Sequence, residues 1–219
     1  MFPSGCGRSP GKIKTKFSIY AYCSVENVNF AVNTENEMIL SNTVEYLREA
    51  RSKYESYDNE WEKVNFDEVS GGYNVYHIKH QFTSIEGGAE GEKTVGNMLA
   101  KLGKQVEFLP EGGKKSPDIK FDNQTWDIKY IDMANEETIR KYIKDARKAD
   151  NGIFYWGSKS DKLEMLIRAI GRTEGYFNKK NELHTMPNIY YMDNGRLKLL
   201  WSKKCKKIKK KGHFHVPIL

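Results

Sequence analysis

The feature that most constrains this chain is a pair of short runs in which apolar and charged residues alternate, one on each side of a polar stretch. Alternation with a period of two across a short polar turn is typical of a β-hairpin. With a two-residue loop at 123–124, we expect Lys120 to pair with Asp127, and Ile119 to pair with Ile128. The region 116–132 is therefore predicted to be two adjacent antiparallel strands.

Successive side chains of a strand point to opposite faces of the sheet, so this hairpin has one apolar and one charged face. The apolar face is predicted to hold Ile119, Phe121, Trp126 and Ile128, and the charged face Asp118, Lys120, Asp127 and Lys129. Metal-assisted hydrolysis of phosphodiesters needs such groups, because carboxylates hold Mg²⁺, the metal supplies hydroxide and a lysine positions water or the leaving oxygens. The hairpin alone leaves open a second interpretation, a solvated face of cross-strand salt bridges.

A third carboxylate precedes the hairpin on a predicted helix. Val95, Met98, Leu99 and Leu102 have the spacing of one helical stripe, and Gly103 marks the end of the helix. Glu92 precedes Val95 by three residues and shares this buried stripe, which makes it a candidate site residue. Favourable interaction of Glu92 with the helix N-terminus is the alternative explanation.

The order of these features resembles the core of the PD-(D/E)xK nuclease superfamily over about residues 87–131. The matching features are Glu92 on a helix, a strand at 106–109, Pro117-Asp118, and Asp127-Ile128-Lys129. The resemblance implies that Asp118 is the central metal ligand, Asp127 the second acidic ligand and Lys129 the motif lysine. Glu92 is implied to be the helix carboxylate and a further metal ligand. It implies Mg²⁺ or Mn²⁺ as the cofactor. Asp127 stands where many members carry Glu, and Lys120 is an addition to the family pattern.

The same run also resembles nuclease domains of bacterial contact-dependent toxins and of phage head-associated proteins. This resemblance implies RNA, including tRNA, or DNA as the substrate, and an immunity protein as a further partner. Two alternatives stay open. One is a metal-independent ribonuclease of the barnase, EndoU or RelE type, with no cofactor, in which Lys129 acts with a histidine such as His77 or His80. The other is a nucleic-acid-binding or phage structural protein without catalytic activity.

The charge of the chain favours a polyanionic partner, because the formal net charge is +7. Lysines precede Asp118 in a loop, and further cations cover a helix predicted after the hairpin. The candidate nucleic-acid contacts are Lys114, Lys115, Lys120, Arg140, Lys144, Arg147 and Lys148. Solvated surface charge is the alternative for each of them.

Strands and helices alternate through the second half of the chain, which predicts an α/β (α+β) fold with a mixed central sheet flanked by helices. A helix is expected to begin at Asn135, a strand buried on both faces is expected at 152–156, and a hairpin is expected at Asn194-Gly195. We divide the chain into an N-terminal extension at 1–69, a nuclease-like domain at 70–202 and a lysine-rich tail at 203–219. In the first part, a strand is expected within 16–32 and a helix at 42–57.

The cysteines Cys6, Cys23 and Cys205 are too scattered for a zinc site or a disulfide framework, which favours a reducing, cytoplasmic site of action. No apolar run approaches the length of a membrane span, and the N-terminus lacks an apolar signal segment. We therefore expect no membrane partner.

Overall fold

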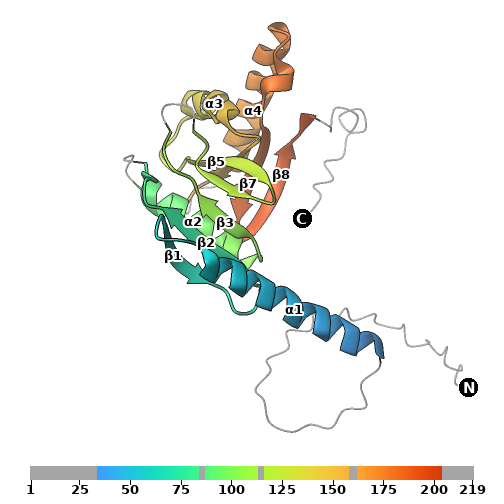
Figure 1. Cartoon of the computed structure of the whole chain (residues 1–219). Helices are drawn as coiled ribbons and strands as arrows, with labels where there is room; N and C mark the ends of the chain where they lie inside the picture. The colour runs from blue at the N-terminus through green and yellow to red at the C-terminus, as the bar shows by residue number, and fades with distance from the viewer. Residues whose placement is uncertain (1–33, 84–86, 113–115, 158–161, 204–219) are drawn as a thin grey trace, which may run out of the picture.

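Helices alternate with groups of one to three strands along the part of the chain that the structure describes (Figure 1). The structure is a computed structural model and describes residues 34–83, 87–112, 116–157 and 162–203. The elements are α1 (Thr34–Ser56), β1 (Trp61–Phe66), β2 (Tyr73–His77), α2 (Gly88–Lys101), β3 (Gln105–Phe108), β4 (Ile119–Phe121), β5 (Gln124–Tyr130), α3 (Glu136–Asp145), η1 (Ala146–Lys148), β6 (Asn151–Tyr155), α4 (Leu163–Lys179), η2 (Leu183–Thr185), β7 (Asn188–Asp193) and β8 (Arg196–Trp201).

The strands form one eight-stranded sheet whose strand order follows the chain from β1 to β8. Strands are parallel where a helix connects them, namely β2 with β3, β5 with β6, and β6 with β7. The other neighbours are antiparallel. A mixed sheet with helical crossovers is an α/β architecture, so the predicted fold class is confirmed.

Helices cover both faces of this sheet. α2 packs through Val95 and Leu99 into an apolar cluster that includes Ile128 and Ile153. α3 and α4 pack into a second cluster, which includes Phe154. Ile153 and Phe154 are neighbours in β6 and point to opposite faces, so α2 lies on one side of the sheet and α3 and α4 on the other. The prediction that this strand is buried on both faces is confirmed.

The N-terminal region joins the sheet. α1 begins earlier than the predicted helix and approaches the sheet near its C-terminal end, where Ala50 and Tyr54 are buried (Figure 1). β1 lies inside the predicted extension at 1–69 and pairs with β2. The strand predicted within 16–32 and residues 204–219 of the tail lie outside the described residues.

The hairpin of β4 and β5 forms with a different register from the predicted one. Its loop is Asp122-Asn123, with φ angles of 51° and 58°. Lys120 therefore pairs with Thr125 and not with Asp127. A two-residue turn of this kind needs positive φ at both loop positions, which Asp and Asn adopt more readily than Gln. The shift is two residues, so each side chain keeps its predicted face.

Two predicted turn signals form as expected. The side chain of Asn135 caps α3 by accepting a hydrogen bond from the Thr138 N–H at 2.9 Å. Asn194 and Gly195 connect β7 to β8 with φ angles of 47° and 72°. Both are local sequence signals, so tertiary contacts were not needed to predict them.

Within the described residues, the helices are all too short or too polar to cross a lipid bilayer.

Candidate active site

Asp118 stands at the point where the chain enters β4. Its main-chain N–H donates to the carbonyl of Trp126 at 3.0 Å, and its own carbonyl accepts from Leu109. The side chain continues the pairing with β5, since Oδ2 accepts the main-chain N–H of Ile128 at 2.7 Å. Oδ1 is left to face a cation, the Nζ of Lys148 at 3.0 Å. The backbone on both sides thus holds this carboxylate in place.

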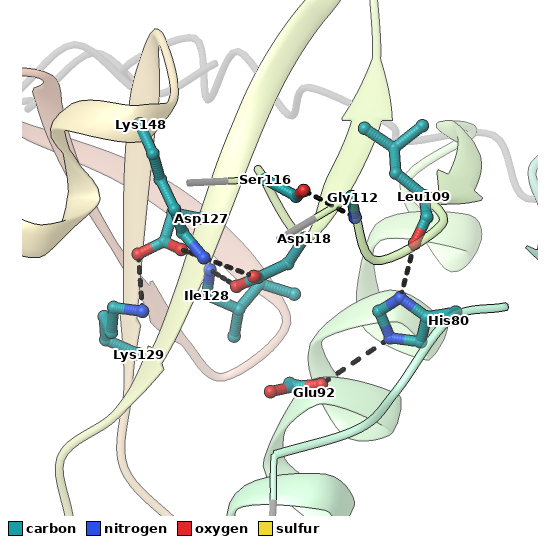
Figure 2. A network of polar contacts seen from close by, with 10 residues as sticks. All are labelled: His80, Glu92, Leu109, Gly112, Ser116, Asp118, Asp127, Ile128, Lys129 and Lys148. Atoms are coloured by element: carbon teal, nitrogen blue, oxygen red, sulfur yellow. Dashed lines mark hydrogen bonds and ion pairs between the residues drawn. The ribbon is translucent and has the colours of Figure 1, made fainter. Parts of the chain in front are cut away.

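Asp127 lies on β5 and is fully buried. Its Oδ2 is 2.7 Å from Lys129 Nζ, and its Oδ1 is 2.8 Å from Lys148 Nζ (Figure 2). Each carboxylate oxygen of Asp127 thus lies at ion-pair distance from one ammonium group. Burial and then the nearby charge of Asp118 raise the pKa of Asp127 to about 6, although Lys129 and Lys148 act in the opposite direction.

Lys148 connects the two carboxylates. Its Nζ lies between Asp118 Oδ1 and Asp127 Oδ1, and 19% of its side chain is exposed. Burial lowers the pKa of Lys148, but the charges of Asp127 and Asp118 outweigh this effect and raise the pKa above its ordinary value. We predicted that Lys148 continues the basic surface of a helix. The structure ends α3 at Asp145 and follows it with η1, from which Lys148 reaches Asp118 and Asp127.

Glu92 reaches the site from α2, and its residue is buried as its place on the apolar stripe predicted. The first turn of α2 lies close to β5, and a Cβ atom at Gly87 or Gly91 would meet the ring of Tyr130 at 2.9 Å. Glycine at these positions lets α2 pack tightly enough to bring Glu92 to β5. Gly87 also has a φ of +73°, a backbone conformation that glycine adopts without steric cost.

His80 supports Glu92, a contact that the sequence did not reveal. β2 ends at His77, and His80 lies after the turn that follows this strand. Its Nδ1 lies 2.8 Å from the carbonyl oxygen of Leu109, and a carbonyl only accepts, so Nδ1 carries the proton. Its Nε2 is 3.8 Å from Glu92 Oε2. Burial lowers the pKa of His80, but the interactions with Glu92, with Leu109 and with the charge of Asp118 outweigh burial. The net effect raises the pKa of His80 above its ordinary value.

A cleft of about 480 Å³ opens beside these groups. Its lining includes Glu92, Asp118, Lys129 and Lys148, while Asp127 lies behind them. Residues from both layers reach the cleft, since Glu92 belongs to α2 and Lys148 follows α3. Three of the four predicted catalytic residues therefore line one cavity, and the fourth, Asp127, contacts two of the lysines that line it (Figure 2).

The donor atoms suit a hard divalent cation. Asp118 Oδ1 and Asp127 Oδ1 both approach the same ammonium group, so they converge on one cation position. Carboxylate oxygens are the ligands that Mg²⁺ and Mn²⁺ prefer, usually with water completing the shell. Within the described part of the chain, no group of three His, Cys, Asp or Glu side chains is arranged around a common metal position. Because their Oδ1 atoms converge, Asp118 and Asp127 are the pair that would hold such an ion.

The other predicted contacts lie outside this cluster. Lys120 is exposed and pairs with Thr125 on one side and Glu107 on the other, a consequence of the corrected register. Arg140 forms an ion pair with Glu137 at 2.6 Å. Lys114 and Lys115 lie outside the described residues. His77 lies near the start of β1, with Nε2 3.9 Å from Oε2 of Glu60.

A second basic surface involves Lys144 and Arg147 together with α4. The ammonium groups of Lys144 and Lys180 lie 4.3 and 4.6 Å from the ring centre of Tyr176. Arg147 stands over the ring of Phe177 at 5.2 Å. We call Lys144, Arg147, Tyr176 and Lys180 the Tyr176 patch. The sequence predicted Lys144 and Arg147 as contacts, but not Tyr176 of α4 or Lys180, which follows that helix.

Comparison of this chain with protein-family models, with curated proteins and with solved structures gave no match.

Proposed function

We propose that this protein is a nuclease that hydrolyses phosphodiester bonds of RNA or DNA with Mg²⁺ or Mn²⁺ as its cofactor. One observation carries the proposal. The Oδ1 atoms of Asp118 and Asp127 converge within 3.0 Å on one cation position, next to Lys129 in a cleft. A divalent cation held by Asp118 and Asp127 would supply a Lewis acid next to the phosphate.

The residues around that position have distinct roles in this proposal. Asp118 and Asp127 hold the cation, and the hydrogen bond from Ile128 to Asp118 keeps the first carboxylate oriented. Lys129 lines the cleft and places its ammonium group where negative charge develops on a phosphate. Glu92 approaches the cleft from α2, with His80 behind it, and is placed to orient a water molecule.

The proposed substrate is nucleic acid because the chain as a whole carries a net positive charge. The net charge is +7, and the Tyr176 patch adds a basic surface on the side of α3 and α4. Cations that neutralise backbone phosphates release counterions, which drives binding without regard to sequence. Substrate length and base identity are not implied by such contacts.

A second candidate is a metal-independent ribonuclease. It is favoured by Lys148, whose ammonium group already neutralises Asp118 and Asp127 at the cation position. In such an enzyme Lys129 and Lys148 would stabilise the charge of the phosphate directly. The two candidates differ in their response to a chelator.

The test is cleavage of total tRNA and of plasmid DNA by the purified chain, each with Mg²⁺, with Mn²⁺ or with EDTA. The variants are Asp118→Asn and Lys129→Met, and Lys101→Met removes an exposed lysine at the end of α2 as a control. We expect cleavage that stops in EDTA and falls about 100-fold or more in both site variants. Cleavage that persists in EDTA would establish the second candidate. Absence of cleavage with salt-sensitive binding retained would reveal a binding protein.

A further inference from the structure

We propose that Lys148 and a divalent cation are alternative occupants of the position between Asp118 and Asp127, and that loading of the cation moves the Lys148 ammonium group into the cleft. The inference rests on the proposed function and describes how its site is filled. It gives Lys148 a role that its place in the sequence, after a basic helix, does not indicate.

The distances make the two occupants exclusive. Lys148 Nζ is 3.0 Å from Asp118 Oδ1 and 2.8 Å from Asp127 Oδ1. Mg²⁺ binds carboxylate oxygens at about 2.1 Å, so an ion shared by these oxygens would lie within the contact radius of the ammonium group. One position thus cannot hold both groups.

The charges lead to the same result. Asp118 and Asp127 together with Lys129 and Lys148 form a set of two carboxylates and two ammonium groups, which is electrically neutral. A divalent ion added to this set would face a positive charge at close range in a largely buried environment, where repulsion is strong. Departure of Lys148 removes that repulsion and frees the oxygens that the ion needs.

Lys129 is not expected to leave. Its Nζ contacts Asp127 Oδ2, the oxygen that does not contact Lys148. Lys129 therefore remains compatible with an ion at the Oδ1 position. The two lysines have similar exposure, 18% and 19% of the side chain, so they form a matched pair for experiment.

The cleft can accommodate the displaced ammonium group of Lys148. Lys148 lines the cleft, and its side chain is a flexible stem with a charged end. In the cleft, the ammonium group would contact a phosphate as a point charge. Cation loading would thus deliver a second lysine to the substrate at the moment when the site becomes competent.

The first measurement is the affinity for Mn²⁺ by calorimetry, without nucleic acid. We expect Lys148→Met to bind Mn²⁺ about tenfold or more tightly than the unmodified chain, because the competing cation is gone. Lys129→Met removes the same charge from the same carboxylate but not from the shared position, so its gain should be smaller. Lys141→Met removes an exposed lysine of α3 and should leave the affinity unchanged.

The second measurement follows Lys148 itself. The folded chain is treated briefly with an amine-acetylating reagent, with and without Mn²⁺, and the modification of each lysine is quantified by mass spectrometry. Lys148 should be protected without the ion and modified several times faster with it, while exposed Lys141 should react equally in both states. Asp118→Asn, which weakens ion binding, should reduce the response of Lys148.

The outcomes separate this inference from the proposed function. Mn²⁺ binding that depends on Asp118 but leaves Lys148 protected, with no affinity gain in Lys148→Met, overturns the inference and preserves the metal-dependent nuclease. Binding seen only in Lys148→Met supports exclusive occupancy while overturning metal dependence of the natural chain. Absence of binding in both proteins overturns both proposals.

Discussion

The carboxylate of Asp118 accepts the main-chain N–H of Ile128 at 2.7 Å, just beyond the last backbone pair between β4 and β5. Its other oxygen lies 3.0 Å from Lys148. One side chain therefore continues the sheet and also presents charge to the candidate site. Variants of Asp118 can therefore separate its hydrogen bond to Ile128 from its charge next to Lys148.

We predict that Asp118→Ala destabilises the fold more than Asp118→Asn. Alanine leaves the N–H of Ile128 without its acceptor, which costs about 1–3 kcal/mol for a buried group, whereas asparagine keeps an oxygen there. Both variants remove the negative charge, so the difference between them isolates the hydrogen bond. Urea unfolding measures it. Equal stabilities would show that the Ile128 N–H finds another acceptor.

Asp127 should give the stability a recognisable pH dependence. Its pKa is raised to about 6, above the value of ~3.9 that is ordinary for an unfolded chain. Between these values the folded protein binds more protons than the unfolded protein, so stability falls as the pH rises through this window. Asp127→Asn has no titratable group at this position, so its stability lacks this contribution to the pH dependence. The free energy of unfolding of the unmodified chain, relative to the variant, should fall between about pH 4 and pH 6 and level off above pH 7.

The measurement is urea unfolding of both proteins across that pH range. The difference in unfolding free energy between the two proteins cancels the contributions of other carboxylates, such as Asp67. Burial raises the pKa of Asp67, but the hydrogen bonds from Ser70 and Val69 outweigh burial and lower this pKa. A difference that rises with pH would mean that the lysines dominate and that folding depresses the pKa of Asp127.

Gly91 should be intolerant of a methyl group. A Cβ at this position would lie 2.9 Å from the Tyr130 ring, so Gly91→Ala must push α2 away from β5, at a cost of about 1–3 kcal/mol. Gly171→Ala is the matched control, because a Cβ there meets nothing within 4 Å in α4. That change should stabilise the protein by up to about 1 kcal/mol through helix propensity. Thermal unfolding compares them, and equal effects would refute the packing argument.

The Tyr176 patch should contribute to nucleic-acid binding mainly through charge. Lys144→Ala and Lys180→Ala should each weaken binding and reduce the slope of log affinity against log salt by about 0.7–0.9, the value expected for one phosphate contact. Fluorescence anisotropy at several salt concentrations measures this slope. Lys101→Ala serves as the control. If all three variants behave alike, the patch has no specific role in binding.

Some features of the site followed from local sequence alone. Period-two alternation placed Asp118, Asp127 and Lys129 on one face of the hairpin, and helical spacing placed Glu92 on the buried stripe of α2. These assignments survived the error in register, because a shift of two residues exchanges strand partners without exchanging faces. The alternation of side chains between the two faces of a strand depends only on the order of residues in the chain.

What the sequence determined by itself was thus the class of fold, the sorting of side chains between faces, and the caps and turns of α3 and the β7–β8 hairpin. Only the tertiary structure placed Lys148 between Asp118 and Asp127, and His80 behind Glu92. The physical reason is range. Backbone periodicity and turn preferences act over a few residues, whereas these ion pairs join segments whose mutual position is set by how α2 and η1 pack against the sheet.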